Sequence, residues 1–193
     1  MGMTNRLLQQ INAIVPLSET EKQAFAAITT HKRLQKNESL MRQGDICRNV
    51  TFVHMGSLRL FHTVDGEEKT IQFFFENDWY TDYRSFLTSQ PTIENAQALD
   101  ACDLVQFNRT DLEQIYRQHP VFERFGRISA ERAFLSLSTR NTMLTDQSPE
   151  ARYQQLIRDR PNLFQRVPQY HIASFLGIKP ESLSRIRRRL ATR

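Results

Sequence analysis

The chain has 193 residues, 39% of them hydrophobic and 24% charged, with a formal net charge of +5. Thirteen Phe residues can supply a core, and no apolar run approaches the roughly 20 residues needed to span a membrane. The N-terminal segment lacks the pattern of a secretory signal. The sequence therefore favours a cytoplasmic globular protein of one large or two small domains, and it argues against a membrane partner.

The first elements along the chain are predicted to be helical, over residues 4–35. Leu7 and Ile11 lie one helical turn apart on an apolar stripe, which a proline then ends. Ser18, followed three residues later by Glu21, has the spacing of a capping box and predicts the start of a second helix.

After this helical start, the period of the apolar residues changes to two. Short segments rich in Val, Phe, Leu and Ile follow, among them "SLMRQGD", "VTFVHMGSLRLFHTV", "EEKTIQFFFE" and "AQALDACDLVQFNR". Turns are predicted at Gly56 and at Asp65-Gly66, and the latter is the clearest hairpin signal in the chain. Closely spaced strands of this kind predict a small barrel or roll.

A long helix is predicted from Pro120, and its apolar band is wider than one packed face needs. The band contains Val121, Phe122, Phe125, Ile128, Phe134, Leu135 and Leu137. Two interpretations stay open: the helix packs only on its own barrel, or it also forms the seam of a homodimer. We adopt the homodimer seam as the working hypothesis.

Positive charge is concentrated at the C-terminal end of the chain. Residues 151–193 contain ten basic and two acidic side chains, a net charge of +8, whereas the rest of the chain sums to −3. A basic segment attached to a mildly acidic body predicts a polyanionic partner for that segment alone.

Residues 169–190 meet the requirements of a helix-turn-helix motif. Ala173 is a small residue for a close helix crossing, Gly177 suits a turn with positive φ, and Pro180 is favourable at the start of a second helix. The predicted apolar contacts are Ile172, Leu176, Ile178, Leu183, Ile186 and Leu190. A solvated arginine-rich tail would need none of these features, so we expect this segment to bind double-stranded DNA.

The same spacing assigns roles on the second helix. Arg185 can make a bidentate contact with guanine, and Glu181 can accept a hydrogen bond from cytosine. An alternative for Glu181 is a first-turn carboxylate that favours the helix dipole. The predicted DNA-binding residues are Gln169, Tyr170, Lys179, Glu181, Ser182, Arg185, Arg188 and Arg189.

The predicted fold class is α+β, with a β-roll, a long helix and a terminal helix-turn-helix. We place a domain boundary at Ser148-Pro149, where one helix ends and another begins. The predicted domains are a sensor roll with N-terminal helices at 1–118, a dimerisation helix and hinge at 119–147, and a DNA-binding domain at 148–193.

This order of elements resembles the Crp/Fnr (catabolite-activator-like) family of transcription regulators. "RQGDICRNVTFVHMGSLRLF" looks like the family's roll signature, and the segment from Ser148 is similar to the terminal domain of a Bacteroidetes-type branch. The resemblance implies a cytoplasmic homodimer that binds two-fold-related half-sites and contacts RNA polymerase. Glu181 and Arg185 match the family's base-reading pair, whereas Pro180 stands where many members carry Arg, so a different operator is expected.

The effector pocket departs from the family's cyclic-nucleotide-binding pattern, in which a Gly-Glu pair binds ribose and an Arg-Ser or Arg-Thr pair binds the cyclic phosphate. Thr81-Asp82 and Glu94-Asn95 stand at those two places. A carboxylate at the phosphate position repels an anion. Arg84, which lies on the other segment, is an alternative source of the positive charge that the family's arginine supplies. The resemblance therefore implies a regulator with a degenerate or altered pocket and an unknown small-molecule effector, if it has one.

The remaining signals favour neither a metal nor a cofactor. Cys47 and Cys102 lack metal-ligand spacing and are interpreted as reduced thiols, with a redox role as the alternative. Iron–sulfur sensing of the Fnr type needs four cysteines. His54 and His62 lack the closely spaced pair of a cupin-like metal enzyme, so no enzyme is expected. Two other functions stay open: a cyclic-nucleotide-responsive regulator, and a module whose basic tail binds RNA or a membrane.

Overall fold

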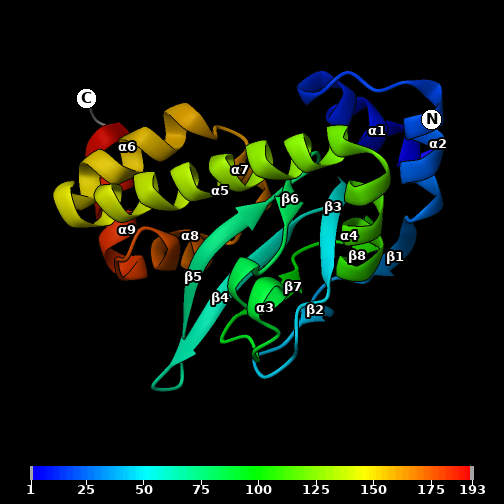
Figure 1. Ribbon diagram of the computed structural model, residues 1–193. Helices are drawn as coiled ribbons and strands as arrows, with labels where there is room; N and C mark the ends of the chain where they lie inside the picture. Colours follow the sequence, from blue (N-terminus) through cyan, green and yellow to red (C-terminus); the bar gives the residue numbers. More distant parts are fainter. Residues whose placement is uncertain (1, 192–193) are drawn as a thin grey trace. The chain divides into compact units, whose positions relative to one another are not determined.

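The computed structural model describes residues 2–191, and Arg193, a member of the basic segment, lies outside them. The chain divides into two compact units, whose helices and strands are labelled in Figure 1. Unit 1 contains Met1–Leu60 and Phe73–Glu131, and unit 2 contains Phe61–Gln72 and Arg132–Arg193.

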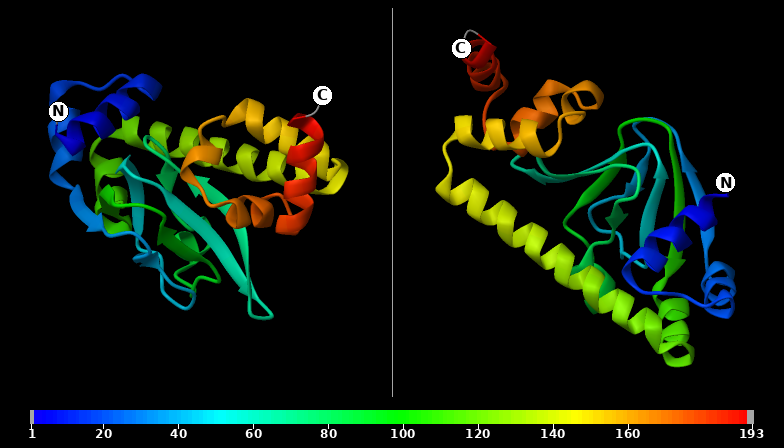
Figure 2. Two further views of the ribbon diagram at one scale, coloured as in Figure 1. Left: turned by 180° about the vertical axis from the view of Figure 1, so that it is seen from behind. Right: turned by 90° about the horizontal axis from the view of Figure 1, so that it is seen from above.

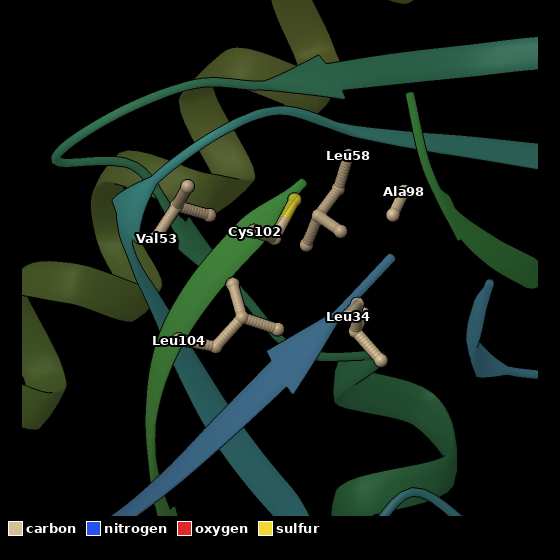
Figure 3. Packing of buried hydrophobic residues seen from close by; sticks show 6 residues of the cluster. All are labelled: Leu34, Val53, Leu58, Ala98, Cys102 and Leu104. Atoms are coloured by element: carbon tan, nitrogen blue, oxygen red, sulfur yellow. The ribbon is translucent and has the colours of Figure 1, made fainter. Parts of the chain in front are cut away.

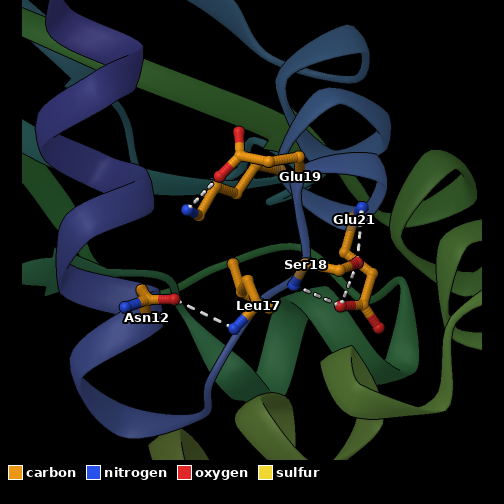
Figure 4. Close-up of polar contacts among 6 residues, drawn as sticks. Asn12, Leu17, Ser18, Glu19 and Glu21 are labelled. Atoms are coloured by element: carbon orange, nitrogen blue, oxygen red, sulfur yellow. Dashed lines mark hydrogen bonds and ion pairs between the residues drawn. The ribbon is translucent and has the colours of Figure 1, made fainter.

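The N-terminal helices form where the sequence predicts them, but the helical region ends earlier. The helices of the N-terminal half are α1 (Met3–Ile14), α2 (Glu19–Ala27) and α3 (Tyr83–Thr88). Ser18 N–H donates to the Glu21 carboxylate at 2.7 Å, and Glu21 N–H donates to Ser18 Oγ at 3.3 Å, which confirms the capping box (Figure 4). The prediction of helix up to residue 35 is wrong, because Thr30–Leu34 is a strand.

The strands of the described chain form two four-stranded sheets. The first sheet has the order β1 (Thr30–Leu34), β8 (Cys102–Asn108), β3 (Asn49–Met55) and β6 (Trp79–Tyr80). The second has the order β2 (Ser39–Met41), β7 (Asn95–Ala98), β4 (Leu58–Val64) and β5 (Glu67–Phe74). Every residue of β1 pairs with β8, so a partner far away in the sequence gives this segment its strand conformation.

A hydrophobic core joins the two sheets of the roll. Figure 3 shows its members Leu34, Val53, Cys102 and Leu104 from the first sheet, and Leu58 and Ala98 from the second. The thiol of Cys102 therefore belongs to the packed core, where it is 2% exposed. This core is the scaffold from which the loops around the expected effector pocket extend.

The predicted turns are confirmed by the backbone. Asp65 and Gly66 have φ values of +53° and +79°, and they join β4 to β5 as the hairpin that the sequence predicts. Gly56 has a φ of +93°, and a Cβ there would lie 2.9 Å from the backbone Cα of Cys102. Only a glycine fits that turn without moving the neighbouring backbone.

Aromatic side chains join the helices of unit 1 to its first sheet. Phe25 of α2 has ring-centroid distances of 5.1 Å to Phe107 and 4.8 Å to Phe122, and Trp79 lies 5.4 Å from Phe125. Phe107 and Trp79 come from the sheet, whereas Phe122 and Phe125 come from the long helix α5 (Pro120–Asp146), which follows α4 (Arg109–Gln118).

This packing divides the apolar band of α5 into two parts. Phe122 and Phe125 are buried in unit 1, so these two members of the band are core residues and not seam residues. Farther along the same uninterrupted helix (Figure 2), Phe134, Leu135 and Leu137 are 70%, 63% and 59% exposed. The two remaining members of the band, Val121 and Ile128, are half-buried.

Unit 2 contains the helices that follow α5. They are α6 (Pro149–Asp159), α7 (Leu163–Arg166), α8 (Gln169–Phe175) and α9 (Pro180–Ala191). Ser148 caps α6 by accepting a hydrogen bond from the Ala151 N–H at 3.3 Å, as its position before Pro149 suggests. The core of the unit includes Tyr153, Leu156, Leu163, Val167, Ile172, Leu176, Leu183 and Ile186.

Candidate functional site

The turn between α8 and α9 has the geometry that its sequence predicts. Gly177 has a φ of +68°. Its N–H donates to the Ser174 carbonyl and the Ile178 N–H donates to the Ala173 carbonyl, both at 3.0 Å. This pair of hydrogen bonds is a Schellman motif, which ends a helix at a residue in the left-handed region. Ala173 is fully buried, as expected for a small residue at a close contact.

The second helix of this pair, α9, has one buried and one exposed face. Leu183 and Ile186 are 1% and 7% exposed and pack inward. Glu181, Arg185 and Arg188 are exposed, and their spacing of four and three residues puts them on one face of the helix. A carboxylate and two guanidinium groups thus project together from a helix whose opposite side is fixed in the core.

The polar side chains of α9 differ in the contacts that they make within unit 2. Arg185 donates a hydrogen bond from Nη2 to Ser182 Oγ at 3.1 Å. Arg189 Nη1 forms a 3.1 Å ion pair with Glu150 of α6. Arg185 is thus held by a neighbour on its own helix, whereas Arg189 is directed toward a carboxylate on another helix.

The start of α8 is also exposed. Gln169 and Tyr170 lie in its first turn, and Tyr170 is 57% exposed with its ring 4.0 Å from that of His171. Lys179, just before α9, is exposed as well. The first residues of α8 and α9 and the Lys179 side chain are therefore all exposed in unit 2. Backbone N–H groups at the starts of helices are suited to binding anions.

In unit 1, three of the predicted effector-pocket residues form side-chain hydrogen bonds with backbone groups of the protein itself. The Thr81 hydroxyl donates to the Asn49 carbonyl at 3.2 Å. Asp82 caps α3 by accepting from the Ser85 N–H at 3.1 Å. The Asn95 side chain accepts from a backbone N–H of the β2–β3 loop at 3.0 Å. These groups hold the loops of the roll together.

Asp82 lies close enough to Glu94 to affect the ionisation of the Glu94 carboxyl. Burial of the Glu94 carboxyl and, to a smaller extent, the negative charge of Asp82 together raise its pKa from 4.5 to about 7. Near neutral pH, Glu94 is therefore only partly ionised, and its repulsion of an anion is strongest above pH 7. The other predicted residue, Arg84, is exposed on α3.

Unit 1 also contains a cavity that the sequence does not indicate. Its volume is about 480 Å³, and it is lined by Leu40, Met41, Gly44, Asp45, Ile46, Cys47, Arg48, Asn49, Thr51, Tyr80 and Gln106. Tyr80, Thr51 and Gln106 occupy one register row across β6, β3 and β8, which explains why they meet in one wall. A row of this kind depends on strand pairing, and no local spacing in the sequence reveals it.

No helix within residues 2–191 is long and apolar enough to cross a membrane. Over the same part of the chain, no three His, Cys, Asp or Glu side chains converge as metal ligands do.

Comparison with known proteins identifies a matching domain family and several solved structures of similar architecture. Residues 31–119 match the protein family described as the cyclic nucleotide-binding domain. The chain is similar to the catabolite activator protein of Thermus thermophilus, with 19% identity, a TM-score of 0.60, and coverage of 95% of this chain and 87% of that one. It is also similar to FixK2 from Bradyrhizobium japonicum, with 15% identity, a TM-score of 0.71, and coverage of 86% and 85%.

A third similar structure is CLP, a c-di-GMP-responsive global regulator of Xanthomonas campestris. The identity is 15%, the TM-score is 0.71, and 91% of this chain and 92% of that chain are covered. A search of curated proteins finds no match. At these identities the structural likeness shows the fold alone, and two of the three proteins are named as an activator and a regulator. The chain thus has a cyclic-nucleotide-binding fold followed by helices, as in catabolite-activator-like regulators.

Proposed function

We propose that the protein is a dimeric, sequence-specific DNA-binding transcription regulator of the Crp/Fnr type, with α8 and α9 as its helix-turn-helix. The observation that carries this proposal is the face of α9 that presents Glu181, Arg185 and Arg188 outward while Leu183 and Ile186 are buried. A helix with this division can enter the major groove without losing its own packing.

The residues of this surface divide into base-reading and phosphate-binding groups. Arg185 reads guanine and Glu181 accepts from cytosine, because both lie early in α9 on its exposed face. Ser182 orients Arg185 through their 3.1 Å hydrogen bond. The phosphate contacts come from Gln169, Tyr170, Lys179 and Arg188. Arg189 is the remaining phosphate contact, because its partly exposed ion pair with Glu150 is weak enough to be exchanged for one with a phosphate.

The exposed part of α5 supplies the dimer seam. Phe134, Leu135 and Leu137 are three large apolar side chains on one helix, each more than half exposed. A second copy that packs its own α5 against them removes this surface from water. The dimer then offers two α9 helices to two-fold-related half-sites, and RNA polymerase is the expected protein partner at a promoter.

The effector pocket is altered rather than built for a cyclic nucleotide. Thr81, Asp82 and Asn95 hold backbone groups of the roll, and Glu94 stands where the family's phosphate-binding pair is expected. The second candidate is a cyclic-nucleotide-responsive regulator, which the match of residues 31–119 to that domain family favours. The 480 Å³ cavity of unit 1 is a candidate space for a small-molecule effector, although its lining contains none of the five predicted pocket residues Thr81, Asp82, Arg84, Glu94 and Asn95.

Selection from a random-sequence pool of duplex DNA tests the proposal. The wild-type protein should enrich a site with two related half-sites about one helical turn apart, and its affinity should fall as salt rises. Failure to enrich any sequence, or equal binding to duplex RNA, would contradict sequence-specific DNA binding. Titration of cyclic AMP in a calorimeter separates the two candidates, since heat of binding at micromolar concentration would favour the second.

A further inference from the structure

A serine of α8 joins that helix to the β4–β5 hairpin, and both belong to unit 2. Ser174 Oγ accepts a hydrogen bond from the Thr70 N–H at 2.9 Å and donates one to the Glu68 carbonyl at 3.1 Å. One hydroxyl thus uses its donor and an acceptor position on two backbone groups of β5. Because β5 is the edge strand of its sheet, these backbone groups face away from β4 and need a partner outside the sheet.

An arginine of α5 completes the same contact. Arg140 Nη2 donates to the Thr70 carbonyl at 3.1 Å and to the Phe175 carbonyl at 3.3 Å. Its guanidinium carbon also lies 4.1 Å from the centroid of the Phe175 ring. Burial and, to a smaller extent, the positive charge of Arg152 together lower the pKa of Arg140 to about 10. The side chain is thus enclosed and charged, and two of its contacts go to α8.

The end of α8 receives a second arginine. Arg152 of α6 donates from Nη1 to the Leu176 carbonyl at 2.6 Å. Two guanidinium groups therefore bind successive carbonyls at the C-terminus of α8, where the helix dipole favours positive charge. α8 has only seven residues, so tertiary contacts rather than its own length must hold it.

From these contacts we infer that Ser174 and Arg140 are positioning residues for DNA binding and that the DNA-reading module includes the β4–β5 hairpin. This inference rests on the proposed function. The contacts of Ser174 and Arg140 with Thr70 fix α8 on the edge of β5. The hydrogen-bonded Schellman turn joins α8 directly to α9, so fixing α8 also fixes the position of α9. The contacts of Ser174 and Arg140 do not cover the side chains proposed to bind DNA. Four of these stay exposed: Tyr170, Glu181, Arg185 and Arg188. The module is then discontinuous in sequence and larger than residues 148–193.

The test uses the full-length protein and the duplex that the wild type selects from a random pool. Ser174→Ala removes the bridging hydroxyl, and Ser174→Thr keeps it. With Ala, exchange of the Thr70 amide hydrogen should become faster, because that N–H loses its acceptor. Affinity for the duplex should fall about five-fold, the equivalent of one net hydrogen bond. Base preference and the salt dependence of binding should not change, because no contact to DNA is removed. Thr should restore both affinity and amide protection.

Arg140→Lys is the second variant, because it keeps the charge while losing the planar guanidinium, whose Nη2 donates to two carbonyls and whose carbon lies over the Phe175 ring. It should also lower affinity about five-fold or more with an unchanged salt slope. Ser136→Ala, the same chemical change at an exposed position of α5, is the control and should bind like wild type. Equal or tighter DNA binding by both Ser174→Ala and Arg140→Lys would overturn the inference. If the wild type itself selects no duplex, the proposed function fails instead.

Discussion

At the scale of single residues, Arg185 is the side chain on which sequence specificity depends most. It is exposed, lies one turn after Glu181, and is held by Ser182 on its own helix. Arg185→Ala should cost about 1–3 kcal/mol per half-site and relax the preference at one base pair. Binding to the selected duplex and to its single-base variants checks this. Uniform weakening across all variants would show that Arg185 contacts phosphate and not a base.

Glu94 gives the roll a stability that depends on pH. Its pKa is about 7 in the folded protein and near 4.5 when exposed, so between these values the folded state holds a proton that the unfolded state has released. The contribution to stability is complete below pH 4.5 and is lost as the pH rises through 7. Glu94→Gln should therefore be more stable than wild type at pH 8, by on the order of 1 kcal/mol.

Urea unfolding at pH 5 and pH 8 measures this difference. Glu67→Gln, the same change at an exposed hairpin position, serves as the control and should leave the pH dependence as in wild type. An equal pH dependence for Glu94→Gln and wild type would contradict the burial of an ionisable Glu94.

At the scale of elements, the close contact between α4 and α5 depends on a glycine inside a helix. A Cβ on Gly126 would overlap the hydroxyl of Tyr116 and lie 2.9 Å from its ring carbon Cζ. Gly126→Ala gains about 1 kcal/mol of helix propensity, but the overlap should make it less stable by about 1–2 kcal/mol in total. Adding Tyr116→Phe should recover much of the loss, because the overlapping oxygen is gone. A double-mutant cycle of unfolding free energies measures the coupling, and additive effects would contradict the contact.

Elements specified by local chemistry could be predicted from the sequence, and elements specified by distant partners could not. Asp65-Gly66 and Gly177 adopt positive φ as their turn types require, and Ser148 caps its helix. The sequence predicts helix at Thr30–Leu34, but this segment is a strand. Its conformation comes from pairing with β8, which local sequence does not reveal.

The candidate site shows the same division. The apolar spacing of α9 correctly predicts that Leu183 and Ile186 are buried, whereas Leu190, which is also expected to face inward, is only half-buried. By contrast, Ser174 and Thr70 are separated by 104 residues in the sequence, so no local sequence pattern could predict their hydrogen bond. The hydrogen bonds that hold Thr81 and Asn95 likewise depend on loops meeting in space.

At the scale of the whole molecule, DNA affinity should depend on pairing of two chains through α5. Leu135 is 63% exposed between two other large apolar side chains of that helix. Leu135→Asp places a charge in the proposed seam, so it should give monomers and weaken binding to a two-half-site duplex by at least ten-fold. Light scattering and duplex titration check both effects. Ser136→Asp adds the same charge at an exposed position of α5 that does not share the face of Leu135, and it controls for charge alone. A dimer that keeps its mass with Leu135→Asp would refute this seam.

The most direct test of the central claim is a competition measurement between the selected duplex and a scrambled duplex of equal length, over a series of salt concentrations. The account predicts that wild type prefers the selected duplex by at least 1,000-fold at physiological salt and that affinity for both falls steeply as salt rises. Arg188→Ala should reduce the salt slope while keeping the preference, and Arg185→Ala should reduce the preference while keeping binding to the scrambled duplex. Equal affinity of wild type for the selected and scrambled duplexes would contradict the account, because α9 would then bind phosphates without reading bases.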